Sequence, residues 1–121
     1  MAAINPTITS SGDYSVKKFL FEGLINGDTT SPIPFAEWAD RSIQITGTFD
    51  TTTVIAEGSN DGGVTYAALT DYQGNAVSFT AAGLEGVQEI TEFMRARITA
   101  GGGSTDINVH ILLRRQTPNR A

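Results

Sequence analysis

The stretch TVIAEGSNDGGVTYAALTDYQGNAVSF, residues 53–79, decides the fold. Side chains alternate in type along residues 54–57 and 64–69, on either side of the polar sequence SNDGG, and again after a second polar turn at residues 71–75. Asn, Asp and Gly tolerate the positive φ values of hairpin loops, and a period of two places one set of side chains on a core and the other in water. We therefore predict three short strands joined by two tight turns, and we interpret SNDGG as a turn needed for folding.

Further segments with this alternation are residues 16–24, 42–49, 93–99 and 107–113. A strand is favoured for the first of them, with a short helix as the alternative. In the last two, the arginines and His110 are predicted to point outward. Glycines at positions 83 and 86 disfavour a long helix between these segments. The sequence predicts an all-β fold, an antiparallel β-sandwich or jelly roll of about seven or eight strands.

The predicted β-sandwich domain spans residues 13–115 and is flanked by two polar segments. Residues 1–12 are small and polar and are interpreted as an extended N-terminal arm outside the core, and residues 116–121 as a C-terminal tail. Residues 26–40 carry two prolines and are predicted to form a long loop, with one helical turn near its end.

Composition and charge limit the classes of partner. The chain has 121 residues, no cysteine and a net charge of −5, which divides into −3 over residues 1–40, −6 over 41–94 and +4 over 95–121. Nucleic-acid binding depends on cations that neutralise phosphates, so we expect no nucleic-acid partner. No apolar run is long enough to span a bilayer and the N-terminus lacks signal-peptide features, so we expect no membrane partner and a soluble protein that is not exported by a cleaved signal.

Groups for catalysis are scarce, since His110 is the sole histidine and has no obvious partner acid or nucleophile. We predict an ordinary strand histidine, no enzymatic activity and no cofactor. Four loop aspartates have two interpretations, turn formation, which is commoner, and calcium binding. These are Asp28, Asp40, Asp61 and Asp71.

Three parts of the sequence together resemble small virion proteins of phages. They are EGSNDGGVTYAALTDYQGNAVSFTAAG at residues 57–83, NPTITSSGDYSVKKFLFEG at 5–23 and RARITAGGGSTDINVHILLRR at 95–115. Similar β-sandwich proteins are decoration, or cement, proteins that bind the outside of an assembled capsid as dimers or trimers. The resemblance implies a virion structural protein that is made in the host cytoplasm and lies on the capsid exterior. Its implied partners are the major capsid protein and further copies of itself.

Two groups of residues are candidates for these contacts. One is the N-terminal arm, which can order on a neighbour, and the other is the basic end of the chain, which suits an acidic surface. The candidate residues are Asn5, Pro6, Ile8, Arg95, Arg97, Arg114 and Arg115.

A competing resemblance is to discoidin-like carbohydrate-binding sandwiches, in which an SxDG turn precedes a tryptophan. Here Tyr66 stands in the place of that tryptophan. The candidate sugar-stacking residues are Trp38, Tyr66 and Tyr72, although the commoner role for Trp38 is to cover one end of the sandwich. A tail or head-completion subunit of the virion is a third possibility.

Overall fold

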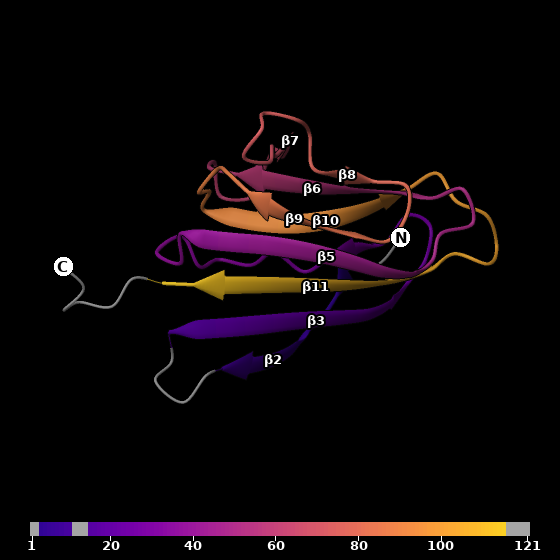
Figure 1. Ribbon diagram of the computed structural model, residues 1–121, viewed down its shortest axis with the longest axis horizontal. Helices are drawn as coiled ribbons and strands as arrows, with labels where there is room; N and C mark the ends of the chain where they lie inside the picture. Colours follow the sequence, from indigo (N-terminus) through magenta and orange to yellow (C-terminus); the bar gives the residue numbers. More distant parts are fainter. Residues whose placement is uncertain (1–2, 11–14, 116–121) are drawn as a thin grey trace.

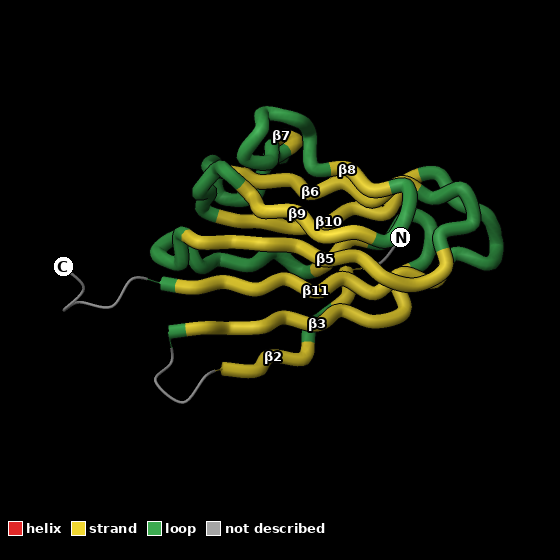
Figure 2. The backbone as a smooth tube through the Cα atoms, in the orientation of Figure 1, coloured by secondary structure: helices red, strands yellow, loops and turns green. Residues whose placement is uncertain are grey.

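The computed structural model describes residues 3–10 and 15–115, which form two β-sheets and contain no helix (Figures 1 and 2). The six-stranded sheet has the order β1 (Ala3–Ile4), β4 (Thr29–Thr30), β10 (Phe93–Thr99), β6 (Thr53–Ser59) and β7 (Ala67–Ala68), with β8 (Ser78–Phe79) also paired to β6. The five-stranded sheet has the order β2 (Thr7–Ser10), β3 (Val16–Leu24), β11 (Asp106–Arg114), β5 (Asp40–Thr48) and β9 (Gly83–Val87).

Strand pairing is antiparallel throughout, apart from the parallel pair β1 and β4. The all-β prediction is confirmed, and both sheets contribute to a single hydrophobic core, as in a sandwich. The jelly-roll connectivity stays a prediction. Four of the eleven described strands have only two residues, too few for a period of two to be recognised in the sequence.

Alternate side chains of β10 and β11 form the centre of the hydrophobic core. Met94, Ala96 and Ile98 point inward from β10 and are buried, whereas the arginines between them are only partly buried. In β11 the inward residues are those at the odd positions from 107 to 113, and all four are buried. The predicted directions of these side chains are confirmed.

The segment 53–79 differs from the predicted succession of three strands. Both β7 and β8 pair with β6, at opposite ends of the same edge, and the chain between them makes a short excursion. This excursion is closed by the turn at Asp71, whose Oδ1 accepts hydrogen bonds from the N–H groups of Gln73 and Asn75 at 2.9 and 3.0 Å. Val64 is exposed and lies outside any strand, because the loop after β6 continues to residue 66.

The loop after β6 is held by the carboxylate of Asp61. Its Oδ1 accepts hydrogen bonds from the Ser59 hydroxyl at 2.7 Å and from the N–H groups of Val64 and Thr65 at 3.1 and 3.0 Å, while Oδ2 accepts from the Thr65 hydroxyl. Gly62 and Gly63 follow with φ of 79° and 86°. The hydrogen bonds from Thr65 and Ser59 lower the pKa of Asp61 well below its ordinary value, and the turn interpretation of SNDGG fits this arrangement.

Replacing Asp61 with asparagine is expected to destabilise the fold in a pH-dependent way. The pKa of Asp61 is lower in the folded than in the unfolded protein, so its contribution is complete above about pH 4 and is lost as the pH falls towards the folded pKa. The difference in melting temperature between wild type and Asp61→Asn should therefore be largest at neutral pH and narrow in acid. A difference that stays constant down to about pH 2 would contradict this account.

Residues 3–10 of the N-terminal segment pair with other strands in both sheets. Ala3–Ile4 pairs with β4 in one sheet, and Thr7–Ser10 pairs with β3 in the other. Asn5 and Pro6 connect the two strands, so a few residues bridge both layers. The predicted C-terminal tail lies outside the described residues.

One end of the core is closed by the segment between β4 and β5 together with the start of β5. Trp38 in that segment and Arg41 in β5 are each only 4% exposed. The guanidinium of Arg41 donates to the main-chain oxygens of Trp38, Phe35 and Thr91 at 3.0, 3.1 and 3.2 Å. Burial lowers the pKa of Arg41 from its ordinary value. These bonds fasten β5 to the long loop and to the segment before β10. The expected helical turn at residues 35–39 is a hydrogen-bonded turn, with Trp38 N–H donating to the Phe35 oxygen at 3.1 Å.

Candidate functional site on the outer face of the five-stranded sheet

The outer face of the five-stranded sheet carries two rows of side chains that cross all five strands. Because paired residues in antiparallel strands project to the same side, the register defines both rows. The first row consists of Thr7, Leu20, His110, Gln44 and Leu84, and the second of Thr9, Lys18, Leu112, Ser42 and Gly86.

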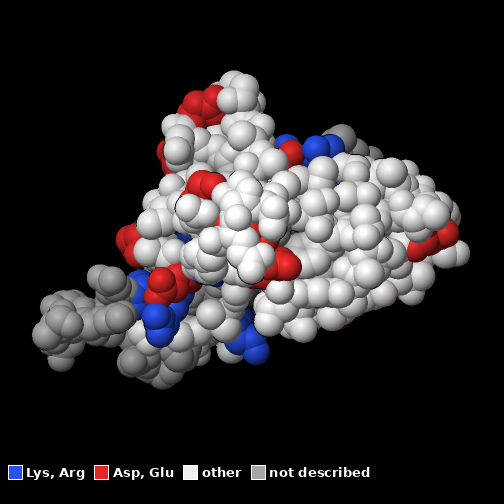
Figure 3. Space-filling view, turned by 45° about the horizontal axis from the view of Figure 1, so that its top comes forward, with Lys and Arg blue, Asp and Glu red and all other residues white. Residues whose placement is uncertain are grey.

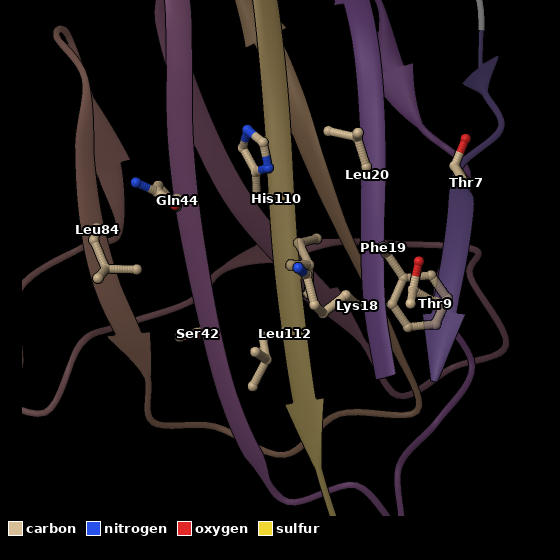
Figure 4. A pocket seen from close by; sticks show the side chains of 11 residues that line it. Thr7, Thr9, Lys18, Phe19, Leu20, Ser42, Gln44, Leu84, His110 and Leu112 are labelled. Carbon is tan, nitrogen blue, oxygen red and sulfur yellow. The ribbon is translucent and has the colours of Figure 1, made fainter. Parts of the chain in front are cut away.

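These rows line a groove of about 520 Å³, which we call the outer groove. Figure 4 shows His110 near its middle, with Leu20 on β3 to one side and Gln44 on β5 to the other. Lys18 is the one charged residue in the lining. The Nε2 atom of His110 lies 3.2 Å from the Thr46 hydroxyl oxygen, so the ring is held by the neighbouring strand.

The outer groove combines apolar and hydrogen-bonding side chains. Leu84 and Leu112 are exposed, and the threonines, Ser42 and Gln44 supply donors and acceptors beside them. Among the described residues no group of three or more His, Cys, Asp or Glu side chains is placed to hold a metal ion. This combination of side chains suits contact with the surface of another protein or with an extended ligand.

Tyr72 lies beside the outer groove. A Cβ atom added to Gly86 would be 2.3 Å from Cε2 of Tyr72, so the ring lies directly on the backbone of β9, next to Ser42 in the second row. The Tyr72 side chain is nevertheless 66% exposed. An exposed aromatic ring at the rim of a polar groove is a surface on which a flat ligand can stack.

The other two aromatic candidates lie elsewhere. Trp38 is buried, with the Phe35 ring 6.2 Å away and the cationic groups of Lys17 and Arg115 at 5.4 and 5.3 Å from its own ring. This placement corresponds to the interpretation that Trp38 covers one end of the core, and it leaves no ring face for a sugar. Tyr66 is stacked against the guanidinium of Arg95, which belongs to the six-stranded sheet. The three aromatics therefore do not form one stacking surface.

The basic end of the chain is divided between the two sheets. Arg95 and Arg97 project from β10 in the six-stranded sheet, whereas Arg114 and Arg115 lie at the end of β11 in the five-stranded sheet. Arg114 donates from Nε to Asp40 Oδ2 at 2.9 Å, an exposed ion pair at one end of the outer face. Figure 3 shows Lys and Arg side chains in separate groups rather than one continuous patch.

The candidate residues of the N-terminal arm lie at the edge. Ile8 is exposed on β2, and it projects to the side opposite Thr7 and Thr9, which line the outer groove. Asn5 is exposed and Pro6 is half-buried between the two short strands. Whether these residues contact a capsid stays a prediction.

Most of the residues that line the outer groove were not predicted from the sequence. Alternation correctly assigns Ser42, Gln44 and His110 to an outward face, but outward residues appear equally on every strand. The missing information is that β2 and β9 flank the central strands and that this particular face is hollowed. Thr7, Thr9 and Leu84 come from segments for which the sequence predicts no strand.

No protein-family model and no curated protein matches the sequence. Among solved structures, the chain is similar to the crystal structure of SPBc2 prophage-derived protein YomS, with a TM-score of 0.57 and 11% sequence identity. The similarity covers 81% of this chain and 93% of that one. At this low identity the comparison shows a shared fold.

Proposed function

We propose that this chain is a structural protein of a bacteriophage virion, which binds the outer surface of the assembled head as a decoration, or cement, protein. The observation that carries the proposal is the fold that it shares, along most of both chains, with a prophage-derived protein. The proposed partners are the major capsid protein and further copies of the chain, and the proposal assigns no catalytic activity.

Such a protein acts through differential affinity. A ligand that binds the assembled shell, and not the dissociated subunits, stabilises the shell by that difference, and contacts across neighbouring subunits multiply the effect. The outer groove offers exposed apolar side chains beside hydrogen-bonding groups, a mixture that protein contact surfaces also have. We assign the capsid contact to this face.

The test uses purified capsids that lack the protein. Added protein should bind them saturably and raise the temperature at which the shell dissociates. Cryo-electron microscopy of the decorated particle should place its density on the capsid exterior. Density confined to the tail of the native particle would overturn the proposal in favour of a tail or head-completion subunit.

Replacing Leu112 with aspartate is expected to weaken capsid binding at least about tenfold, because a carboxylate in the middle of the groove has to be desolvated on contact. Occupancy at increasing protein concentration measures the change. Val64→Asp is the matched control, since Val64 is an exposed aliphatic residue on the loop after β6, and β6 belongs to the other sheet. Equal affinity of Leu112→Asp and wild type would remove the groove from the contact.

A carbohydrate-binding module is the second candidate, favoured by the exposed ring of Tyr72 beside a groove lined with hydroxyl and amide groups. Sugar rings stack on aromatic faces while their hydroxyls exchange hydrogen bonds with such side chains. A glycan array, probed with and without calcium, tests this function directly. An array without any bound glycan would end it.

A further inference from the structure

The outer face of the six-stranded sheet holds two arginines on one carboxylate. Arg95 on β10 is directly opposite Glu57 on β6, and Arg97 is two residues further along the same face. Nε of Arg95 donates to Glu57 Oε1 at 3.1 Å, and Nε of Arg97 donates to Glu57 Oε2 at 3.0 Å. The side chain of Glu57 is only 9% exposed. We call these three residues the arginine fork.

The outer ends of both guanidinium groups are unoccupied within the described part of the chain. Each arginine uses Nε for Glu57, and neither makes a hydrogen bond from its Nη atoms to a described residue. Every buried side-chain nitrogen or oxygen among the described residues has a hydrogen-bond partner. Since these Nη atoms have none, they are not buried and are accessible to solvent. The side chains of Arg95 and Arg97 are 25% and 38% exposed.

Both guanidinium groups are held in position before any ligand arrives. The Cζ atom of Arg95 lies 3.7 Å from the centre of the Tyr66 ring, in stacking contact. Tyr66 is the last residue of the loop after β6, which Asp61 fixes by accepting hydrogen bonds from Thr65. Because the arginine orientation is already set, a ligand loses less conformational freedom on binding.

The charge of the fork indicates the charge of its ligand. Two guanidinium groups and one carboxylate leave a net charge of +1, within a chain of net charge −5. A single carboxylate matches this charge, and its two oxygens match the paired N–H groups of a guanidinium. A phosphate dianion or a nucleic acid brings excess negative charge to an acidic protein.

We propose that the arginine fork binds the carboxylate of an aspartate or glutamate side chain on a partner polypeptide. The Nη groups of Arg95 and Arg97 donate the hydrogen bonds, and Glu57 positions both arginines without touching the ligand. This adds a contact on the sheet opposite the outer groove. It holds whether or not the groove binds a capsid, so the two proposals fail independently.

The test follows arginine side-chain Nε–Hε signals of the ¹⁵N-labelled protein by NMR while N-acetylglutamate amide, which carries a single carboxylate, is added at constant ionic strength. The signals of Arg95 and Arg97 should shift saturably and more than those of the other arginines. Inorganic phosphate at the same ionic strength should bind more weakly. Absence of a saturable shift at both arginines, or tighter binding of phosphate, would overturn the proposal.

Arg97→Gln is expected to weaken the binding of N-acetylglutamate amide at least about tenfold, since it removes one charged donor pair. Arg114→Gln is the matched control, because it removes the same charge from the ion pair with Asp40 on the other sheet and should leave the affinity unchanged. Equal losses in both variants would mean general charge attraction and would overturn the site. If Arg97→Gln unfolds, Arg97→Lys keeps the charge without the planar donor pair, and binding should still weaken several-fold.

Discussion

Arg41→Met is expected to destabilise the protein by about 3 kcal/mol, because it leaves the buried main-chain oxygens of Trp38 and Thr91 without their donor and removes one of the two donors to the Phe35 oxygen. Each unsatisfied buried group costs about 1–3 kcal/mol, and part of the sum is offset because the cost of burying the guanidinium disappears. Methionine fills a similar volume, so the change reports mainly on hydrogen bonding. Urea denaturation monitored by tryptophan fluorescence measures it, since Trp38 lies at this end of the core.

Arg114→Met is the control for Arg41→Met. Arg114 forms an exposed ion pair with Asp40, and such pairs contribute about 0–1 kcal/mol. Arg41→Lys should recover little stability, because one ammonium group cannot reach three oxygens in the geometry of the planar guanidinium. An Arg41→Met protein within about 1 kcal/mol of wild type would show that those oxygens find other partners.

Gly47→Ala is expected to cost at least about 3 kcal/mol, from two causes that act together. Gly47 has a φ of 116°, which L-residues rarely adopt, and an added Cβ would lie 2.2 Å from the main-chain oxygen of Asp106. That oxygen belongs to β11, whose residue Ile107 pairs with Gly47, so it cannot move without disturbing the central ladder. Thermal unfolding measures the loss.

Two glycines separate these causes. Gly23 has a φ of 72° and no atom within 4 Å of an added Cβ, so Gly23→Ala should cost only the backbone strain, about 1–2 kcal/mol. Gly103 has neither a positive φ nor a close neighbour, so Gly103→Ala should be almost neutral. A Gly47→Ala protein no less stable than Gly23→Ala would show that the contact with Asp106 is relieved.

The sequence predicts the long strands well because their two faces meet different surroundings. Ile43 and Ile45 are buried between polar neighbours in β5, and the same contrast marks β10 and β11. Gly47 was not recognisable as special, since alternation alone places it on the inward face with these isoleucines. Its backbone conformation and its approach to β11 arise from the pairing, which a local pattern does not contain.

The candidate surfaces required the strand order. Arg97 and Arg115 are close in the basic end of the sequence, yet the sheets place them on different layers. Conversely, Glu57 is distant from the arginines in sequence and lies between them in space. Short strands such as β1 and β9 add to this gap, because a few residues of ordinary composition become strands only when an edge is available to pair with.

Both sheets have their central strand in the last part of the chain, since β10 and β11 follow every other strand in sequence. During synthesis, β3 and β5 therefore leave the ribosome before β11, the strand that lies between them in the sheet. In the same way, β6 leaves the ribosome before its partner β10. Neither layer can close until residues 93–114 are available, and the pairings then formed span long stretches of chain. We therefore expect folding to be late and slow for the chain's size. Shortening the protein from its C-terminal end first removes the middle strand of one sheet, β11, and then that of the other, β10.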